Sequence, residues 1–545
     1  MNFAAYAIVS LLSLLLQGLA PPGGQGDDAT GPGLTETEAP PPVSYLIIAP
    51  ELFRDELEPL LAFHTALGRT PSILTLEAIT APSAPATASP DAASALVPVT
   101  ADQIRNAVEA VARDNPLRFL LLVGDPAPRR DGGPAVPAGV GRKVAYPGIV
   151  DDDTFPTDWT YSVESRAGRV AVGRFPVSTE AEVTAMVEKT VRYAQGEGGA
   201  WQRRLALFGG PANFNPFVDA LIESETTRLL DEAIPYEFDV DFVFAKPNSA
   251  YAWRSDDLGG KISRELGEGA LFSAYFGHGM PTALDLVEFR DRYYSIGDAE
   301  QLANVSIPIG KPVFFALACH TGAFDQPGGA LSLAEGLFLN PDGPIAVVAS
   351  SRTSHPYGNA VLGRAMVAEL LTTRPPTVGE AVLAVKRAMG HHRMLVGEFL
   401  VPGDVRTLFE EHAALYNLLG DPGLPIRYPG SLRVETEGPT RLGQPIQVLV
   451  EHSGKATLTL ETRRKEIRGA LELVPATGAV EEAFAAMARN HDVAVDKVVH
   501  RVDVDVRLGD AIVLPAAPAA GLYVVKVLTH GTDSAAGSVF VDVRP

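Results

Sequence analysis

The chain contains a single cysteine, Cys319, among its 545 residues. One cysteine cannot form an internal disulfide, so Cys319 is expected to be a free thiol and no disulfide framework supports the fold. Hydrophobic residues make up 46% of the chain, which is enough for a large packed core. A thiol that occurs only once in a globular chain therefore invites a chemical rather than a structural interpretation.

Excess positive charge is also missing. The 45 Lys and Arg residues are outnumbered by 66 Asp and Glu residues, and the formal net charge is −21. Binding to a phosphate backbone requires basic patches, so nucleic acid is not a predicted partner. The sequence likewise has no GxGxxG after a strand and no GxxxxGK[ST], which argues against a nucleotide-binding protein.

The amino-terminal residues 1–20 are apolar but contain no Lys or Arg. Gly18, Leu19 and Ala20 supply the small residues of a signal-peptidase site, so we expect a signal peptide over 1–20 and a secreted, periplasmic or cell-surface protein. The alternative is an uncleaved anchor, the one case in which the membrane is a predicted partner. Residues 21–42, rich in Pro, Gly and acidic side chains, are expected to form a disordered linker.

From residue 43 onward, apolar strand-like runs alternate with amphipathic helical stretches, one of them through 217–230. Strands that are apolar throughout favour a largely parallel sheet covered on both faces, and we predict two α/β lobes, 43–200 and 201–430. Residues 81–98 are expected to be a surface insertion. Alternating strands from 431 to 545 predict a small β-sandwich with a helical insertion near 480–487.

Two strand ends carry the candidate chemistry. The run FFALACHTG (314–322) places Cys319 after one strand, and AYFGHG (274–279) places His278 after another. Functional groups collect outside the carboxyl ends of parallel strands, so the two side chains emerge on one rim if these strands are neighbours. The imidazole can then deprotonate the thiol and later protonate a leaving amine. The N–H groups of Gly279 and Cys319 are natural donors to a tetrahedral oxyanion.

The same residues also allow a structural interpretation. Buried cysteines are usually inert small hydrophobes, and a histidine after a strand is often structural. His320 lies beside the thiol, but adjacent residues of an extended chain point to opposite faces, so it is the poorer candidate for a base. His355 follows the next strand and could line the pocket.

Several sequence blocks resemble the gingipain-type cysteine peptidases, relatives of caspases and legumains. GHG (277–279) and the run from Cys319 to Asp325 resemble that family's histidine and cysteine blocks, and YLII (45–48), LVGD (122–125), VGRFPV (172–177) and YNLLGDP (416–422) match it in the same order. The resemblance implies two caspase-like α/β lobes with mostly parallel sheets covered by helices, followed by a C-terminal immunoglobulin-like β-sandwich. It also implies Cys319 as nucleophile and His278 as acid/base, with Gly279 and Cys319 as backbone oxyanion donors.

The third catalytic group is left open by the sequence. Some family members orient the histidine with an acid near the strand that reads RVAVGRF here, and this chain has Arg169 at that place. Asp158 and Asp285 are substitutes by position only, each also a plausible solvated or turn-forming acid. Asp158 and Glu182 are conceivable acids for an arginine-specific pocket, although Glu182 already fits a helix cap with Thr179.

The predicted function is that of an exported cysteine endopeptidase that cleaves protein or peptide substrates through an acyl-enzyme. The alternative is a catalytically inactive peptidase-fold protein that acts as a surface binding or scaffolding module, which the missing acid at Arg169 favours. No cofactor is expected to be required. The acids at 151–153 could bind structural calcium, although their spacing does not form a specific motif.

Overall fold

The computed structural model describes residues 42–80, 98–127, 134–143, 153–211, 231–391, 404–531 and 534–545. The predicted signal peptide (1–20), the predicted linker apart from residue 42, the segment 81–97 and the whole of the helix expected at 217–230 lie outside these ranges. So do two of the three acids at 151–153. Within the described ranges, no helix is both long enough and apolar enough to cross a membrane.

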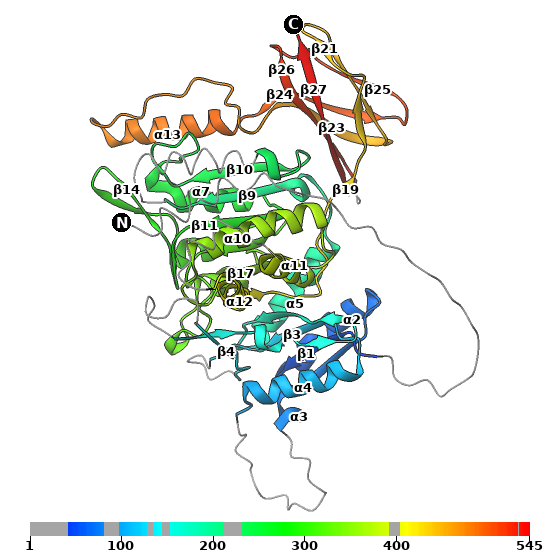
Figure 1. Cartoon of the computed structure of the whole chain (residues 1–545), viewed down its shortest axis with the longest axis vertical. Coiled ribbons are helices and arrows are strands. Elements are labelled where there is room, and N and C mark those ends of the chain that lie inside the picture. Colours follow the sequence, from blue (N-terminus) through cyan, green and yellow to red (C-terminus); the bar gives the residue numbers. More distant parts are fainter. Residues whose placement is uncertain are drawn as a thin grey trace, which may run out of the picture.

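Ten strands form one continuous sheet through the middle of the molecule (Figure 1), in the order β10-β9-β11-β16-β17-β18-β8-β3-β1-β2. Nine of them agree with the prediction to within a few residues, and β18, in a stretch where helices alone were expected, completes the ten strands. Their bounds are β1 (Tyr45–Ala49), β2 (Pro71–Thr75), β3 (Phe119–Val123), β8 (Ala171–Phe175), β9 (Arg204–Gly209), β10 (Asp239–Phe244), β11 (Phe272–Phe276), β16 (Val313–Leu317), β17 (Ala346–Ser350) and β18 (Tyr416–Leu419).

The direction of the strands reverses once within this sheet. Every neighbouring pair is parallel except β17 and β18, which are antiparallel. The carboxyl ends of β11, β16 and β17 therefore lie at the same edge as the amino ends of β18 and β8. Because β18 comes from the predicted second lobe and pairs with β8 of the first, the two lobes share one sheet.

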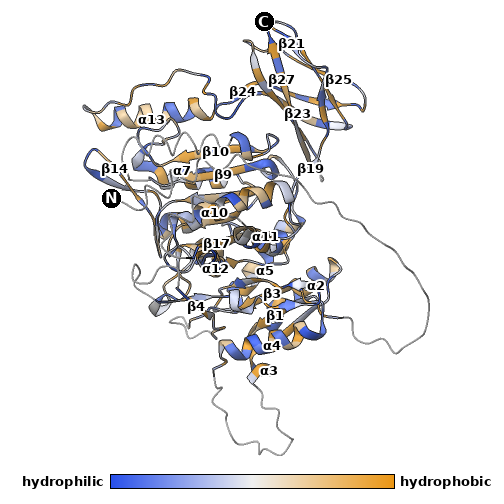
Figure 2. Cartoon of the chain, viewed as in Figure 1, coloured by the Kyte–Doolittle hydropathy of each residue, from blue (hydrophilic) through white to orange (hydrophobic). Residues whose placement is uncertain are grey.

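Helices cover both faces of the sheet, as predicted. On one face of β16, Phe315 belongs to the same core cluster as Leu362, Val382 and Leu408 from three helices that follow it in the chain. Phe314, which points to the other face, packs with Leu337 and other residues of a second cluster. The strands are hydrophobic along their length, whereas the helices are mixed (Figure 2), which is the pattern of a sheet buried on both sides.

The helices around the sheet begin and end close to their sequence signals. Thr100 and Gln103 form a capping box at the start of one of them: the Thr100 hydroxyl accepts from the N–H of Gln103, and the Gln103 side chain accepts from the N–H of Thr100. The bounds are α2 (Arg54–Ala66), α3 (Leu76–Thr80), α4 (Ala101–Asp114), α5 (Glu180–Gln195), α7 (Leu258–Gly267), α8 (Ala299–Ala303), α9 (Leu333–Leu339), α10 (Pro356–Ala368), α11 (Val378–His391) and α12 (Val405–Leu415).

The C-terminal strands form a β-sandwich with its own core. One sheet holds β19 (Gly430–Ser431), β21 (Thr440–Arg441), β23 (Gly454–Thr462), β24 (Val498–Val506), β26 (Gly521–Thr529) and β27 (Ala535–Arg544), and the other holds β20 (Val434–Thr436), β22 (Ile446–Val450) and β25 (Ala511–Leu514). The predicted sandwich is thus confirmed, while its immunoglobulin-like character stays a prediction.

The helical insertion of the sandwich does not pack on the sandwich itself. The helix α13 (Val480–Val495) lies along the second lobe (201–430), beside α7 and β10 (Figure 1). Its Phe484 ring lies 5.5 Å from Phe289 and 5.6 Å from Tyr294, on the hairpin of β14 (Leu286–Phe289) and β15 (Arg292–Ser295). At the hairpin tip, Arg290 donates to the carbonyl of Gly478 at 3.0 Å. The insertion therefore links the sandwich to the second lobe.

Candidate active site

The candidate histidine and cysteine follow neighbouring strands. In the parallel pair of β11 and β16, Phe276 is in register with Leu317. His278 and Cys319 each come two residues after these partners, so they leave the same edge of the sheet at the same level. The sequence-based condition for a Cys-His pair, that the two strands be neighbours, is confirmed.

The histidine loop, residues 277–280, lies directly against the cysteine loop. A Cβ built on Gly279 would lie 2.8 Å from the carbonyl oxygen of Cys319, 2.9 Å from the Ala318 Cβ and 2.7 Å from the Thr321 methyl group. Such distances leave no room for a side chain. Gly279 is therefore required for the close approach of the two loops.

His278 itself is exposed and its ring is not engaged. Its carbonyl oxygen accepts a hydrogen bond from the Tyr275 hydroxyl at 3.0 Å, which fixes the backbone of the loop. Across the described parts of the chain, no side chain hydrogen-bonds to the His278 imidazole. The ring is thus positioned through its backbone and left accessible for proton transfer.

The thiol of Cys319 is half-buried and contacts the loop that follows β17. The N–H of Ser354 donates to Sγ at 3.4 Å, and Sγ lies 3.5 Å from the carbonyl oxygen of Ser354. The N–H of Cys319 makes no hydrogen bond to any backbone or side chain that the structure describes, so it is available as an oxyanion donor.

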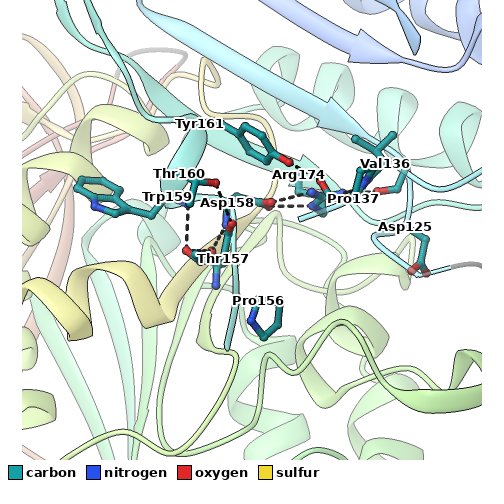
Figure 3. Close-up of polar contacts among 12 residues, drawn as sticks. Asp125, Val136, Pro137, Pro156, Thr157, Asp158, Trp159, Thr160, Tyr161 and Arg174 are labelled. Carbon is teal, nitrogen blue, oxygen red and sulfur yellow. Dashed lines mark hydrogen bonds and ion pairs between the residues drawn. The ribbon is translucent and has the colours of Figure 1, made fainter. Parts of the chain in front are cut away.

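Asp158 is not near the histidine but in a buried ion pair. Its two carboxylate oxygens accept from Nε and Nη2 of Arg174 at 2.8 and 2.6 Å (Figure 3). The same guanidinium donates to the carbonyl oxygens of Gly124 and Val136, both at 2.7 Å. Asp158 is 4% exposed, so the expectation of a solvated loop acid was wrong. Because both of its carboxylate oxygens accept from Arg174, Asp158 is not available as a partner of the histidine or as the acid of a specificity pocket.

Asp285 lies closer to the histidine loop. Its Oδ1 accepts from the N–H of Leu286 at 2.7 Å, while Oδ2 is buried without a hydrogen-bond partner among the described residues. Burial, together with the negative charge of Asp285, raises the pKa of Tyr275, whose hydroxyl contacts the backbone of His278. Of the two predicted third members, Asp285 is the one that the structure places beside this loop.

Arg169 lies at the edge of the sheet shared with the site, but it contacts neither candidate residue. Its guanidinium lies 4.4 Å over the ring of Trp159, and its Nε donates to the Ser162 hydroxyl at 3.1 Å. Glu182 belongs to the start of α5, where its carboxylate accepts from the N–H of Ser178 at 2.6 Å. Thr179 accepts from the N–H of Glu182, as the predicted cap requires.

The remaining histidines near the thiol have structural partners. His320 has φ of 60°, a left-handed conformation that turns the chain after Cys319, and its Nε2 lies 2.8 Å from the Thr353 hydroxyl. His355 caps α10: its Nδ1 accepts from the N–H of Tyr357. Burial lowers the pKa of His355 to about 4.

Sequence reasoning missed the residues that hold the loop after β17. Arg352 forms a two-pronged ion pair with Asp325 at 2.8 and 2.7 Å, which joins this loop to the cysteine loop. The ring of the fully buried His412 accepts from the N–H of His355 at 2.8 Å. Asp325 lies within the run that resembles the cysteine block, so its position was visible in the sequence, but its partner was not.

No metal centre emerges from the described residues, since no group of three or more His, Cys, Asp or Glu side chains could hold an ion there. Two of the acids considered for calcium, Asp151 and Asp152, lie outside those residues.

A histidine and a thiol at adjacent strand ends of an α/β sheet form the arrangement that a cysteine nucleophile with a histidine base requires. Residues 38–427 match the family model described as Peptidase family C25, and the chain belongs to this family. It is therefore a cysteine-type endopeptidase, in agreement with the resemblance found in the sequence.

Solved structures show the same fold. The Arg-specific cysteine proteinase gingipain R (RGPB) is 17% identical, with a TM-score of 0.51, and the match covers 94% of this chain and 100% of that one. The complex of Porphyromonas gingivalis RgpB pro- and mature domains is 18% identical, with a TM-score of 0.49 and coverage of 92% and 100%. No curated protein matches the sequence.

Proposed function

We propose that Cys319 and His278 form the catalytic dyad of an exported endopeptidase. The observation that carries this proposal is the register of β11 and β16, which brings the two residues to one edge at one level. The packing of Gly279 against Cys319 supports it, because it joins the two loops. The apolar residues 1–20 support the exported, cell-surface or periplasmic location.

The proposed reaction is acyl transfer to the thiol followed by hydrolysis. His278 accepts the Cys319 proton, and the thiolate attacks the carbonyl carbon of the scissile peptide bond. The resulting oxyanion accepts hydrogen bonds from the N–H groups of Cys319 and Gly279. The imidazolium then protonates the leaving amine, and a water molecule deprotonated by His278 releases the acyl group. The reaction uses no cofactor, and its substrates are proteins or peptides.

We assign Asp285 as the acid that orients His278. Its buried, unpartnered Oδ2 and its influence on Tyr275 support this placement. Asp285→Asn is expected to lower kcat without abolishing cleavage, since no direct bond from the carboxylate to the ring exists in this structure. An unchanged kcat would remove Asp285 from the mechanism.

A peptide-library cleavage assay on the purified protein tests the dyad. Cys319→Ala and His278→Ala are expected to lower cleavage by at least a thousandfold. His320→Asn is the matched control, since Asn tolerates the left-handed conformation of His320 and this variant leaves the proposed dyad intact. Cleavage that survives Cys319→Ala would refute the proposal. An inert wild-type protein would instead favour the binding or scaffolding alternative.

A further inference from the structure

Ser354 surrounds the Cys319 sulfur with three polar groups. Its N–H donates to Sγ at 3.4 Å, its carbonyl oxygen lies at 3.5 Å and its hydroxyl oxygen lies at 3.7 Å. Among the residues that the structure describes, no other hydrogen-bonds to this sulfur. Ser354 is 3% exposed, so water competes little for these contacts.

The Ser354 hydroxyl is oriented by two further residues. The Tyr416 hydroxyl donates to Asn359 Oδ1 at 2.7 Å, and Asn359 Nδ2 donates to Ser354 Oγ at 2.9 Å. Because Ser354 Oγ accepts from the amide, its own proton is left for an acceptor. Two acceptors lie within reach, the Tyr416 hydroxyl oxygen at 3.4 Å and the sulfur at 3.7 Å, and the sulfur is the one that becomes negatively charged in the proposed reaction. Tyr416 is fully buried and burial raises its pKa, so it stays a donor at the head of this chain.

We propose that Ser354 is a further catalytic residue, which donates hydrogen bonds to the Cys319 sulfur as it becomes a thiolate, with Asn359 and Tyr416 as positioning residues. The inference rests on the proposed function because it takes Cys319 as the nucleophile. The thiol proton goes to His278, and Ser354 keeps both of its own protons. Hydrogen bonds to an ionised acceptor are stronger than neutral ones, so the donation favours the thiolate over the thiol.

This role fits a site in which no carboxylate contacts the histidine. In a triad, a carboxylate stabilises the imidazolium that forms when the proton arrives. Here the described residues leave the His278 ring without such a partner, whereas the sulfur receives the N–H of Ser354 and lies within reach of its hydroxyl. The carbonyl oxygen of Ser354 accepts from the neutral thiol, so the two donors must outweigh this contact once the proton has left. In the ion pair of thiolate and imidazolium, the protein thus stabilises the thiolate.

The unique thiol allows a test that needs no substrate. The rate at which iodoacetamide alkylates native Cys319 at pH 7 is expected to fall roughly tenfold in Ser354→Ala, in line with the loss of one hydrogen bond to a charged group. Ser354→Thr, which keeps the hydroxyl, is expected to restore most of the rate. Unfolding would expose the thiol, so a loosened variant would react faster. An equal or faster rate in Ser354→Ala would overturn the proposal.

Asn359→Asp tests the direction of the hydrogen bonds. A carboxylate only accepts, so the Ser354 hydroxyl would turn toward residue 359 and away from the sulfur, and the alkylation rate is expected to fall about as much as in Ser354→Ala. The double variant Ser354→Ala with Asn359→Asp separates the turning of the Ser354 hydroxyl from the effect of the added negative charge. If Asn359 acts through Ser354, the double variant is no slower than Ser354→Ala; a further decrease would refute the positioning role of Asn359.

The two proposals can fail separately. A wild-type protein that cleaves no peptide would refute the proposed function and leave the alkylation result standing. Equal alkylation rates in an active enzyme would refute the role of Ser354 and leave the dyad standing.

Discussion

Gly279 lies against Cys319 so closely that a Cβ on the glycine would come within 2.8 Å of the Cys319 carbonyl oxygen. The contact joins the loop that carries the histidine to the loop that carries the thiol. It is made by backbone and small side chains, which cannot move aside as a flexible side chain could. The geometry of the proposed dyad therefore depends on a glycine whose proposed contribution to the reaction is its N–H alone.

Gly279→Ala is expected to lower kcat/KM by at least tenfold while the protein stays folded, because the methyl group pushes the histidine loop away from the thiol. Gly336→Ala is the matched control, since nothing beyond its own helix, α9, lies within 4 Å of the place that a methyl group would take and alanine favours helix. Peptide cleavage measures the loss of kcat/KM in both variants, and far-UV circular dichroism checks that they stay folded. Full activity in Gly279→Ala would show that the loops need not touch.

Asp158→Asn is expected to destabilise the protein by about 3–5 kcal/mol, because it leaves the buried Arg174 charge without its counter-ion. Arg105→Ala, which breaks the exposed pair with Glu109, should cost less than about 1 kcal/mol. Thermal unfolding of both variants measures the difference. If Asp158→Asn unfolded like the wild type but lost cleavage, Asp158 would have a catalytic role that its contacts do not indicate.

Acid is expected to weaken the fold through His412. Burial lowers the pKa of its ring to about 4, from an ordinary value of 6.5. The unfolded chain then binds more protons between these values, so the stability from this group is complete above pH 6.5 and is lost as the pH falls toward 4. The full effect is on the order of 3 kcal/mol.

Thermal unfolding from pH 7 to pH 4.5 measures this dependence. His412→Gln, which cannot titrate in this range, should show a smaller decrease in melting temperature than the wild type. His355 titrates in the same direction, so a residual decrease is expected in the variant. Parallel curves for the two proteins would mean that His412 is not the acid-sensitive group.

Phe484→Ser is expected to release the insertion of the sandwich from the second lobe, because it removes the ring that contacts Phe289 and Tyr294. Leu473→Ser is the control in the same insertion, since Leu473 is 91% exposed and buries almost nothing. Limited proteolysis should cleave the insertion faster in Phe484→Ser alone. Equal cleavage of both variants would show that the insertion is held by other contacts.

Most strands and the positions of the candidate dyad residues could be located from the sequence because their signals are local. Apolar runs mark β11 and β16, and polar residues after them mark His278 and Cys319. The partner of Asp158 could not be predicted in the same way. Arg174 lies within an apolar strand, and only the folded sheet shows that its guanidinium turns toward the carboxylate and two carbonyls.

The sequence by itself determined that a thiol and a histidine follow buried strands, that glycines flank the histidine and that the chain belongs with the cysteine peptidases. These properties follow from the hydrophobic pattern and the order of the motifs, which can be read directly from consecutive residues of the sequence. Only the tertiary structure decided that β11 and β16 are neighbours, that Asp158 forms an ion pair with Arg174 and that the N–H of Ser354 donates to the Cys319 sulfur. Ser354 lies 35 positions beyond Cys319, and Tyr416 lies 62 beyond Ser354. Contacts at such separations are set by strand order and by the reversal between β17 and β18, which no local pattern encodes.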